Sequence, residues 1–162
     1  MSQEPEVGSN SPLVHRRSRI LLLGYGNQYR GDDGIGPVLL QRVAAEVEKI
    51  PLQELTLDLA ETLARYELVV FIDAAVSGDP VTWRELKADH RPSPLSHHLP
   101  PETLLFYAET LYQRAPRAFL LSVRGYSFDF GERLSPEAEG NVQAALAILE
   151  GWLQEQRGNL PS

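Results

Sequence analysis

A glycine-rich stretch near the start of the sequence contains two adjacent acidic residues. The stretch GYGNQYRGDDGIG holds Asp32 and Asp33 and directly follows an apolar run. A third aspartate, Asp73, lies in the run LVVFIDAAV, and two histidines, His97 and His98, precede a pair of prolines. Carboxylate oxygen and imidazole nitrogen together suit a borderline divalent cation such as nickel or zinc. The sequence therefore predicts a metal site, provided that the fold brings the three segments together.

The elements that must position these residues can be predicted from the periodicity of the apolar side chains. Short continuous apolar runs predict buried strands at residues 19–24, 68–76 and 118–123. A weaker strand is expected at 50–55, where Pro51 interrupts the run, and another at 81–86, where Val81 and Trp83 share one face. Helical spacing predicts a helix at residues 36–49, one at 56–67 with Thr56 as its candidate N-cap, and one at 100–114 in which Leu104, Ala108 and Leu111 share a face. A last helix is predicted to begin at Pro136 with Ser135 as its N-cap. The alternating order predicts an α/β fold, a three-layer sandwich in which helices flank a mainly parallel, twisted sheet of about five strands.

Each candidate residue also has a structural alternative. Asp32 or Asp33 could cap the helix that follows the glycine stretch, and Asp73 could close a turn. Exposed histidines such as His97 and His98 are usually solvated and bind nothing. A site is favoured by convergence, because ligands of an open α/β sheet bind beyond the carboxyl ends of its strands, where all three segments are expected.

The composition limits the class of protein. The chain has 162 residues, enough for one domain with a sizeable core. Its formal net charge of −7 argues against nucleic-acid binding, and no apolar run approaches the length of a membrane span. The absence of cysteine excludes disulfides and cysteine metal ligands. We expect a cytoplasmic protein with a flexible leader at 1–18, a single α/β domain at 19–155 and a tail at 156–162.

Two other kinds of site are disfavoured by spacing. The dinucleotide fingerprint requires a third glycine where the stretch has Tyr29, and the lysine of a phosphate-binding loop is missing. Ser127 lies in half of a serine-hydrolase elbow, but Asp129 stands in place of the second glycine. We therefore expect Ser127 to be a loop residue.

Several stretches resemble the motifs of the hydrogenase maturation proteases, the endopeptidases that finish the large subunit of nickel–iron hydrogenases. GYGN and DDGIG match the first motif, FIDAA the second, SHHL the third, and SFDFGERLSPEAEG the C-terminal segment. The matches occur in the family's order over about residues 19 to 155. Many relatives have Asp-Gly-Gly-Thr where this chain reads LQELTLDLAETL, which is closer to a cyanobacterial-type branch.

The resemblance implies both an activity and the residues that perform it. It implies an endopeptidase that removes a C-terminal peptide from the nickel-loaded precursor of the hydrogenase large subunit, its partner. Asp33, Asp73 and His97 match the metal-binding positions, with His98 as a neighbour, and the nickel would be contributed by the substrate. Asp33 and Asp73 would also be catalytic, since an aspartate could activate water or the metal could polarise the carbonyl. We expect the protein to act as a monomer.

Two other functions remain open from the sequence. A receiver domain that accepts a phosphoryl group also has an acidic pair after its first strand and binds magnesium. It needs a lysine after its last strand, however, whereas this chain has Arg124 there. A nickel-binding maturation chaperone is the second alternative, and it would leave the precursor uncut.

Overall fold

The fold is built on one five-stranded β-sheet. The structure is a computed structural model that describes residues 19–90 and 99–158. The strands lie in the spatial order β2-β1-β3-β5-β4, all parallel except β4, which pairs antiparallel with β5. Their bounds are β1 Ile20–Tyr25, β2 Glu48–Leu52, β3 Leu68–Ala75, β4 Val81–Leu86 and β5 Arg117–Arg124. The predicted sheet of five mainly parallel strands is confirmed.

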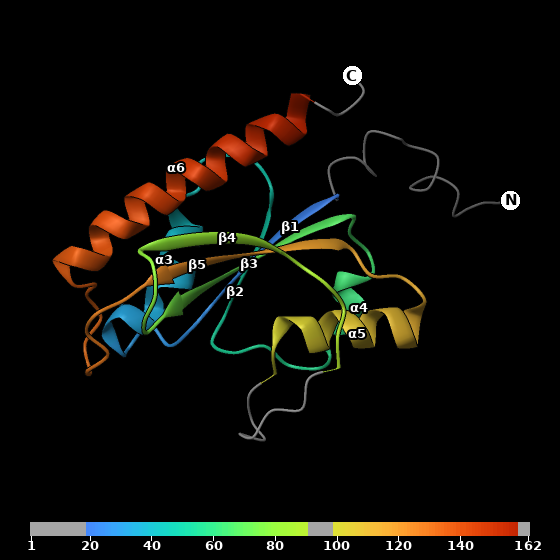
Figure 1. Cartoon of the computed structure of the whole chain (residues 1–162), viewed down its shortest axis with the longest axis horizontal. Helices are drawn as coiled ribbons and strands as arrows, with labels where there is room; N and C mark the ends of the chain where they lie inside the picture. The colour runs from blue at the N-terminus through green and yellow to red at the C-terminus, as the bar shows by residue number, and fades with distance from the viewer. Residues whose placement is uncertain (1–18, 91–98, 159–162) are drawn as a thin grey trace, which may run out of the picture.

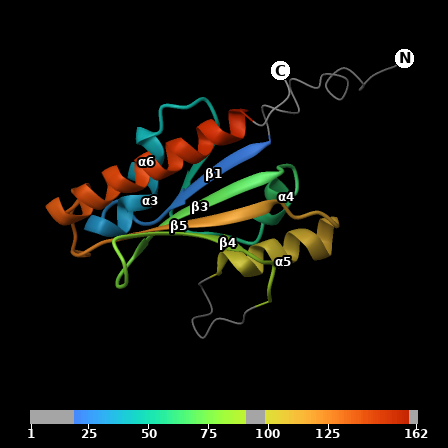
Figure 2. The same cartoon turned by 45° about the horizontal axis from the view of Figure 1, so that its top comes forward.

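Helices cover both faces of this sheet, as predicted for a three-layer sandwich (Figure 1). α3 and the long α6 lie on one face, and α4 and α5 lie on the other (Figure 2). The bounds are a 3-10 helix η1 at Gly31–Gly34, α3 Ile35–Arg42, α4 Leu59–Leu63, α5 Pro101–Tyr112 and α6 Pro136–Gly158. In the part of the chain that the structure describes, no helix is both long and apolar enough to cross a membrane.

The central strands contribute side chains to both apolar layers. In β1, Leu22 belongs to the cluster beneath α3 and α6, whereas Leu21 and Leu23 belong to the cluster beneath α4 and α5. Successive side chains of a strand point to opposite faces, so a strand covered on both sides must be apolar throughout. This is why the runs ILLL and LVVFI lack the polar alternation of a half-exposed strand.

The helix predicted over 36–49 is shorter than expected, because α3 ends at Arg42. Val43 adopts an extended conformation, with φ −71° and ψ 120°. Two side chains from later elements, β2 and α6, bind the backbone beyond this end. Lys49 Nζ donates to the carbonyl oxygen of Val43 over 2.7 Å, and Glu150 on α6 accepts from the N–H of Ala44 over 3.0 Å. These tertiary bonds stabilise an early end that the helical spacing could not predict.

Four smaller predictions also differ from the structure. α4 has only five residues instead of the range 56–67, because its preceding turn bonds Leu59 N–H to the carbonyl of Thr56, three residues back. Thr56 is not the N-cap, a position that Asp58 occupies. β2 begins at residue 48 instead of 50, and its Pro51 is tolerated because β2 is an edge strand. In α5, Leu111 is 54% exposed and does not share the predicted buried face.

The chain connections diverge beside β1. From β1 the chain passes through α3 to β2 on one side, whereas β3 lies on the other side. The loops after β1 and β3 therefore leave the carboxyl edge of the sheet in different directions. Such a switch point is where open α/β sheets bind their ligands. The predicted site segments after β1 and in β3 lie at this point.

Candidate active site

Asp33 and Asp73 lie together at the switch point of the sheet. Asp33 is in η1, just after β1, and Asp73 is near the carboxyl end of β3. Both residues line a hollow of about 280 Å³, to which Tyr25, Asn27 and Leu99 also contribute. The structure thus brings together two of the three predicted metal ligands.

Two glycines allow the loop after β1 to fold tightly against the sheet. Gly26 has a φ of +144°, and a Cβ there would lie 1.9 Å from the carbonyl oxygen of Asp33. A Cβ on Gly36 would lie 2.6 Å from the carbonyl oxygens of both Tyr25 and Ile72. Only glycine can occupy these positions without displacing backbone. The glycines therefore let the Asp33 segment pack directly against the ends of β1 and β3.

Asp73 is held by two hydroxyl groups. Tyr25 Oη donates to Oδ2 over 3.1 Å, and Ser122 Oγ donates to Oδ1 over 3.1 Å. Burial raises the pKa of Asp73 to about 6; these two hydrogen bonds oppose the rise, and the negative charge of Asp33 adds to it. A carboxylate with this pKa can accept and release a proton near neutral pH better than an exposed aspartate.

Asp33 is connected to its own loop by a short series of hydrogen bonds. The N–H of Asn27 donates to Asp33 Oδ2 over 2.8 Å, and the side-chain oxygen of Asn27 accepts from the N–H of Tyr29 over 2.9 Å. Burial is the main cause of the raised pKa of Asp73, and the negative charge of Asp33 makes a smaller contribution in the same direction. A cation between the two carboxylates would relieve this repulsion, and carboxylate oxygens are ligands that divalent metals accept.

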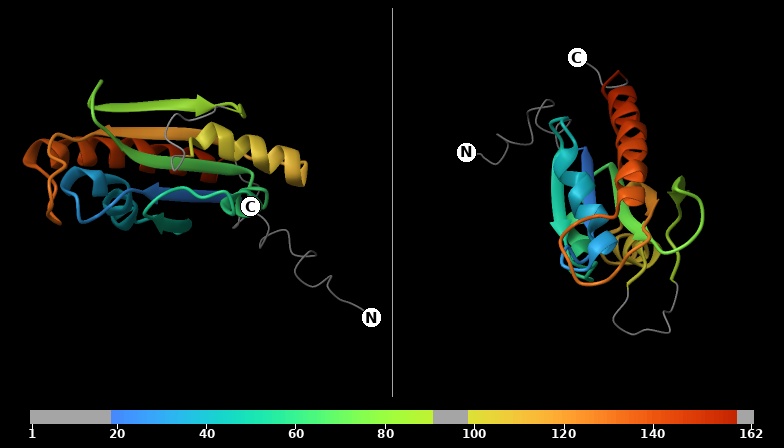
Figure 3. Two further views of the ribbon diagram at one scale, coloured as in Figure 1. Left: turned by 90° about the horizontal axis from the view of Figure 1, so that it is seen from below. Right: turned by 90° about the vertical axis from the view of Figure 1, so that its left-hand side faces the viewer.

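Asp32 has a different environment from its neighbour. It is 0% exposed, and its carboxylate accepts hydrogen bonds over 2.6 to 2.9 Å from the N–H groups of Tyr126, Ser127 and Ser135 and from Ser135 Oγ. Burial raises the pKa of Asp32, but these hydrogen bonds together outweigh burial and hold the pKa below its usual value. Asp32 therefore fastens the loop between β5 and α6 to η1, and Figure 3 shows these segments side by side.

The alternative that Asp32 or Asp33 caps α3 is wrong. Gly34 occupies the N-cap position of α3, and no side chain bonds to the cap there. The capping group lies instead at α6, where Ser135 Oγ accepts from the N–H of Ala138 over 3.2 Å, as predicted. Ser135 thus caps α6 and binds Asp32 with the same hydroxyl group.

His97 and His98 lie outside the described residues. Leu99, two residues after His97, lines the hollow that holds the two aspartates. Within residues 19–90 and 99–158, no three His, Asp or Glu side chains are grouped so that they could hold a metal ion. Asp33 and Asp73 are therefore not joined by a third such side chain from the part of the chain that the structure describes.

The sequence did not identify the residues that hold Asp73. Ser122 lies directly opposite Asp73 in the pairing of β3 with β5, so only the strand register could have found it. Tyr25 lies in the glycine stretch, yet nothing in its spacing indicates a bond to a residue 48 positions away. Ser127 lies in the loop between β5 and α6, so its prediction as a loop residue is confirmed.

Comparison with known proteins yields matches to structures only. No family model matches the sequence, and no curated protein matches it. The hydrogenase maturating endopeptidase HybD from E. coli has a TM-score of 0.69 and is 23% identical, with 85% of this chain and 93% of that chain covered. The hydrogenase 2 maturation peptidase from a Thaumarchaeota archaeon has a TM-score of 0.61 and is 25% identical, with 84% and 98% covered. The nickel–iron hydrogenase maturation protease HybD from Thermococcus kodakarensis has a TM-score of 0.63 and is 23% identical, with 83% and 98% covered.

These matches show that the chain has the fold of the hydrogenase maturation endopeptidases. The alignments extend over more than four-fifths of the chain and nearly all of each solved structure. They concern the same family whose motifs the sequence resembles, so the fold that the resemblance implies is confirmed.

Proposed function

We propose that this chain is an endopeptidase that removes a C-terminal peptide from the nickel-loaded precursor of a nickel–iron hydrogenase large subunit. The observation that carries the proposal is the pairing of Asp33 with Asp73 in one hollow at the switch point of the sheet. The fold shared with named maturation endopeptidases supports the same reaction class. We propose that the single domain over 19–155 performs this reaction in the cytoplasm as a monomer.

In this proposal the nickel belongs to the substrate and is recognised by Asp33, Asp73 and His97. Two carboxylates and an imidazole suit nickel, which accepts both oxygen and nitrogen ligands. The hydroxyl groups of Tyr25 and Ser122 hold Asp73 in one orientation, so that it is prepared for the incoming metal. Recognition through the metal would allow the enzyme to distinguish a loaded precursor from an empty one.

Hydrolysis requires a base for the attacking water and an acid for the leaving amine. We propose that Asp33 or Asp73 accepts a proton from the water as the water oxygen bonds to the carbonyl carbon of the scissile peptide. The same carboxylic acid then gives the proton to the amide nitrogen as the carbon–nitrogen bond breaks.

The receiver alternative is weakened by Asp32. A receiver uses its acidic pair for magnesium, whereas the Asp32 carboxylate is fully buried and accepts four hydrogen bonds from the β5–α6 loop. A receiver also needs a lysine after its last strand. This chain has Arg124 at the end of β5, where its Nη1 donates to the carbonyl oxygen of Gly78. The chaperone alternative differs only in leaving the precursor uncut.

The decisive experiment is incubation with nickel-loaded and nickel-free precursor from the same organism, followed by mass measurement of the large subunit. We expect loss of a C-terminal peptide from the nickel-loaded precursor only, and no loss with Asp33→Asn. If the large subunit keeps its full mass although it binds the protein, the chaperone alternative is correct. Cleavage of both precursors at equal rates would contradict recognition through nickel.

A further inference from the structure

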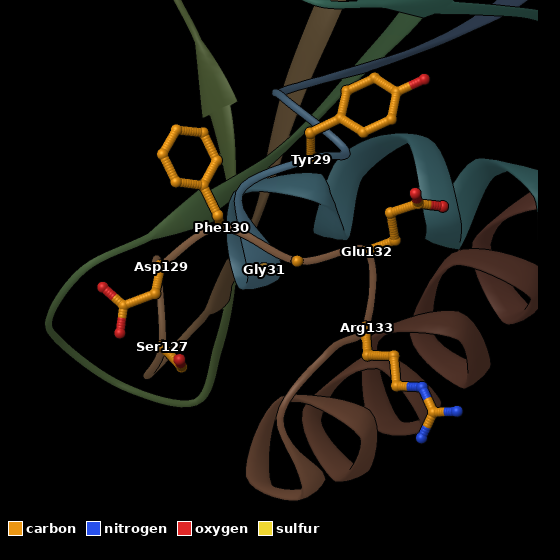
Figure 4. A pocket seen from close by; sticks show the side chains of 8 residues that line it. Tyr29, Gly31, Ser127, Asp129, Phe130, Glu132 and Arg133 are labelled. Carbon is orange, nitrogen blue, oxygen red and sulfur yellow. The ribbon is translucent and has the colours of Figure 1, made fainter.

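Two aromatic side chains project from the surface beside the candidate active site. Tyr29 is 66% exposed and Phe130 is 86% exposed. They line a surface hollow of about 630 Å³, and Figure 4 shows their rings projecting from adjacent segments while Arg133 points away. Large exposed apolar groups gathered at one hollow commonly mark a binding surface.

The backbone beneath these two rings is firmly held. The N–H of Gly131 donates to the carbonyl of Tyr29 over 2.9 Å, and the N–H of Gly31 donates to the carbonyl of Gly131 over 2.8 Å. The Asp32 carboxylate holds the same two segments together from below. Binding to such a preformed surface requires little ordering of the chain, which favours affinity.

The aromatic hollow continues into the candidate active site. Tyr29 also lines a second hollow of about 230 Å³. Asn27 and Gln53 line both this second hollow and the one that contains Asp33 and Asp73. The three hollows therefore follow one another along the surface, and an extended segment of substrate that leaves the carboxylates along them passes Tyr29.

The two exposed aromatic rings favour an apolar occupant of the hollow. The guanidinium group of Arg30 lies 5.4 Å from the centroid of the Phe130 ring, where it helps to fix the ring. Asp129 and Glu132 also line the hollow, and they disfavour phosphate groups and acidic peptides. Aromatic residues and arginine are the side chains that most often carry the binding energy of protein interfaces.

We propose that Tyr29 and Phe130 bind a large apolar side chain in the extended segment of the protein substrate that adjoins the scissile bond. This inference rests on the proposed endopeptidase function and adds a specificity-determining surface to it. The two residues act in substrate binding and do not take part in bond cleavage.

The test measures cleavage kinetics and binding of the nickel-loaded precursor for Tyr29→Ala and Phe130→Ala. Loss of one buried aromatic contact should raise KM and Kd about tenfold for each variant, while kcat stays nearly unchanged. Phe130→Leu should retain most of the affinity, because it keeps a large apolar group. The matched control is Tyr112→Ala, an aromatic residue 44% exposed at the end of α5, which precedes the amino end of β5 and lies far from the carboxyl edge.

The outcomes separate this inference from the proposed function. If the wild-type protein cuts the precursor and both alanine variants keep its KM and Kd, binding of substrate by Tyr29 and Phe130 is refuted and the endopeptidase function stands. If the wild-type protein binds the precursor without cutting it and Phe130→Ala weakens this binding, the role of Phe130 in binding is supported and the endopeptidase function fails. Concentration-dependent self-association that Phe130→Ala removes, measured by sedimentation, would show that a second copy of the chain occupies the hollow and would overturn the inference.

Discussion

Replacing Asp32 with asparagine should destabilise the protein, although the two side chains have nearly the same shape. Oδ2 of Asp32 accepts from Tyr126 N–H, Ser127 N–H and Ser135 Oγ, and Oδ1 accepts from Ser135 N–H. All of these partners donate, whereas an asparagine side chain offers one oxygen and one NH₂ group. The best placement of the amide puts its oxygen at the Oδ2 position, and its NH₂ group then faces the N–H of Ser135.

The magnitude follows from counting these bonds. A buried N–H left without an acceptor costs about 1–3 kcal/mol, and each of the other three bonds loses about 1 kcal/mol when its acceptor is no longer charged. Removing the cost of burying a charge offsets part of this loss, which leaves a net destabilisation of about 3–5 kcal/mol. For a domain of this size the melting temperature should fall by about 10 °C.

The assay is thermal unfolding of Asp32→Asn and wild-type protein over a range of pH. Because the pKa of Asp32 is lowered in the folded state, its contribution is fully present above the unfolded value of about 3.9 and is lost as the pH falls through the folded pKa. The difference in melting temperature between the two proteins should therefore be largest at neutral pH and become smaller below about pH 4. The control is Asp79→Asn in the exposed turn before β4, which should melt like the wild type. A variant that melts within about 2 °C of wild type at neutral pH would refute the reasoning.

The remaining predictions concern the candidate ligands. Asp73→Asn should raise the melting temperature by several degrees at neutral pH, because it removes a buried charge whose hydroxyl partners can also accept hydrogen bonds. Since the pKa of Asp73 is raised to about 6, this gain should be full above that pH and vanish as the pH falls toward about 4, as melting curves would reveal. Asp33→Asn should keep the fold, since its amide oxygen can still accept from Asn27, and should lose precursor processing; a normal processing rate would show that its charge is dispensable. His97→Ala should abolish processing in the mass assay and His98→Ala should retain much of it, whereas the opposite result would exchange their roles.

The sequence by itself determined the elements whose signals are local. Continuous apolar residues mark β1 and β3 because both faces of these strands are covered, and Ser135 with Pro136 marks the start of α6 because an N-cap acts within its own turn. The position of Asp73 near the end of a central strand also placed it at the carboxyl edge of the sheet, where parallel strands bring their ends together.

Only the tertiary structure decided what the distant segments do to one another. α3 ends at Arg42, and the chain beyond that end is held by bonds from Lys49 and from Glu150, the latter 106 residues from the N–H that it binds. Asp32 and Asp33 are indistinguishable in the motif, yet Asp32 is buried by donors 94 to 103 residues away, while Asp33 lines the hollow with Asp73. The pKa of Asp73 likewise depends on burial by layers assembled from the whole chain. Hydrogen-bond partners and burial at this sequence separation are set by packing, which the local pattern of residues does not record.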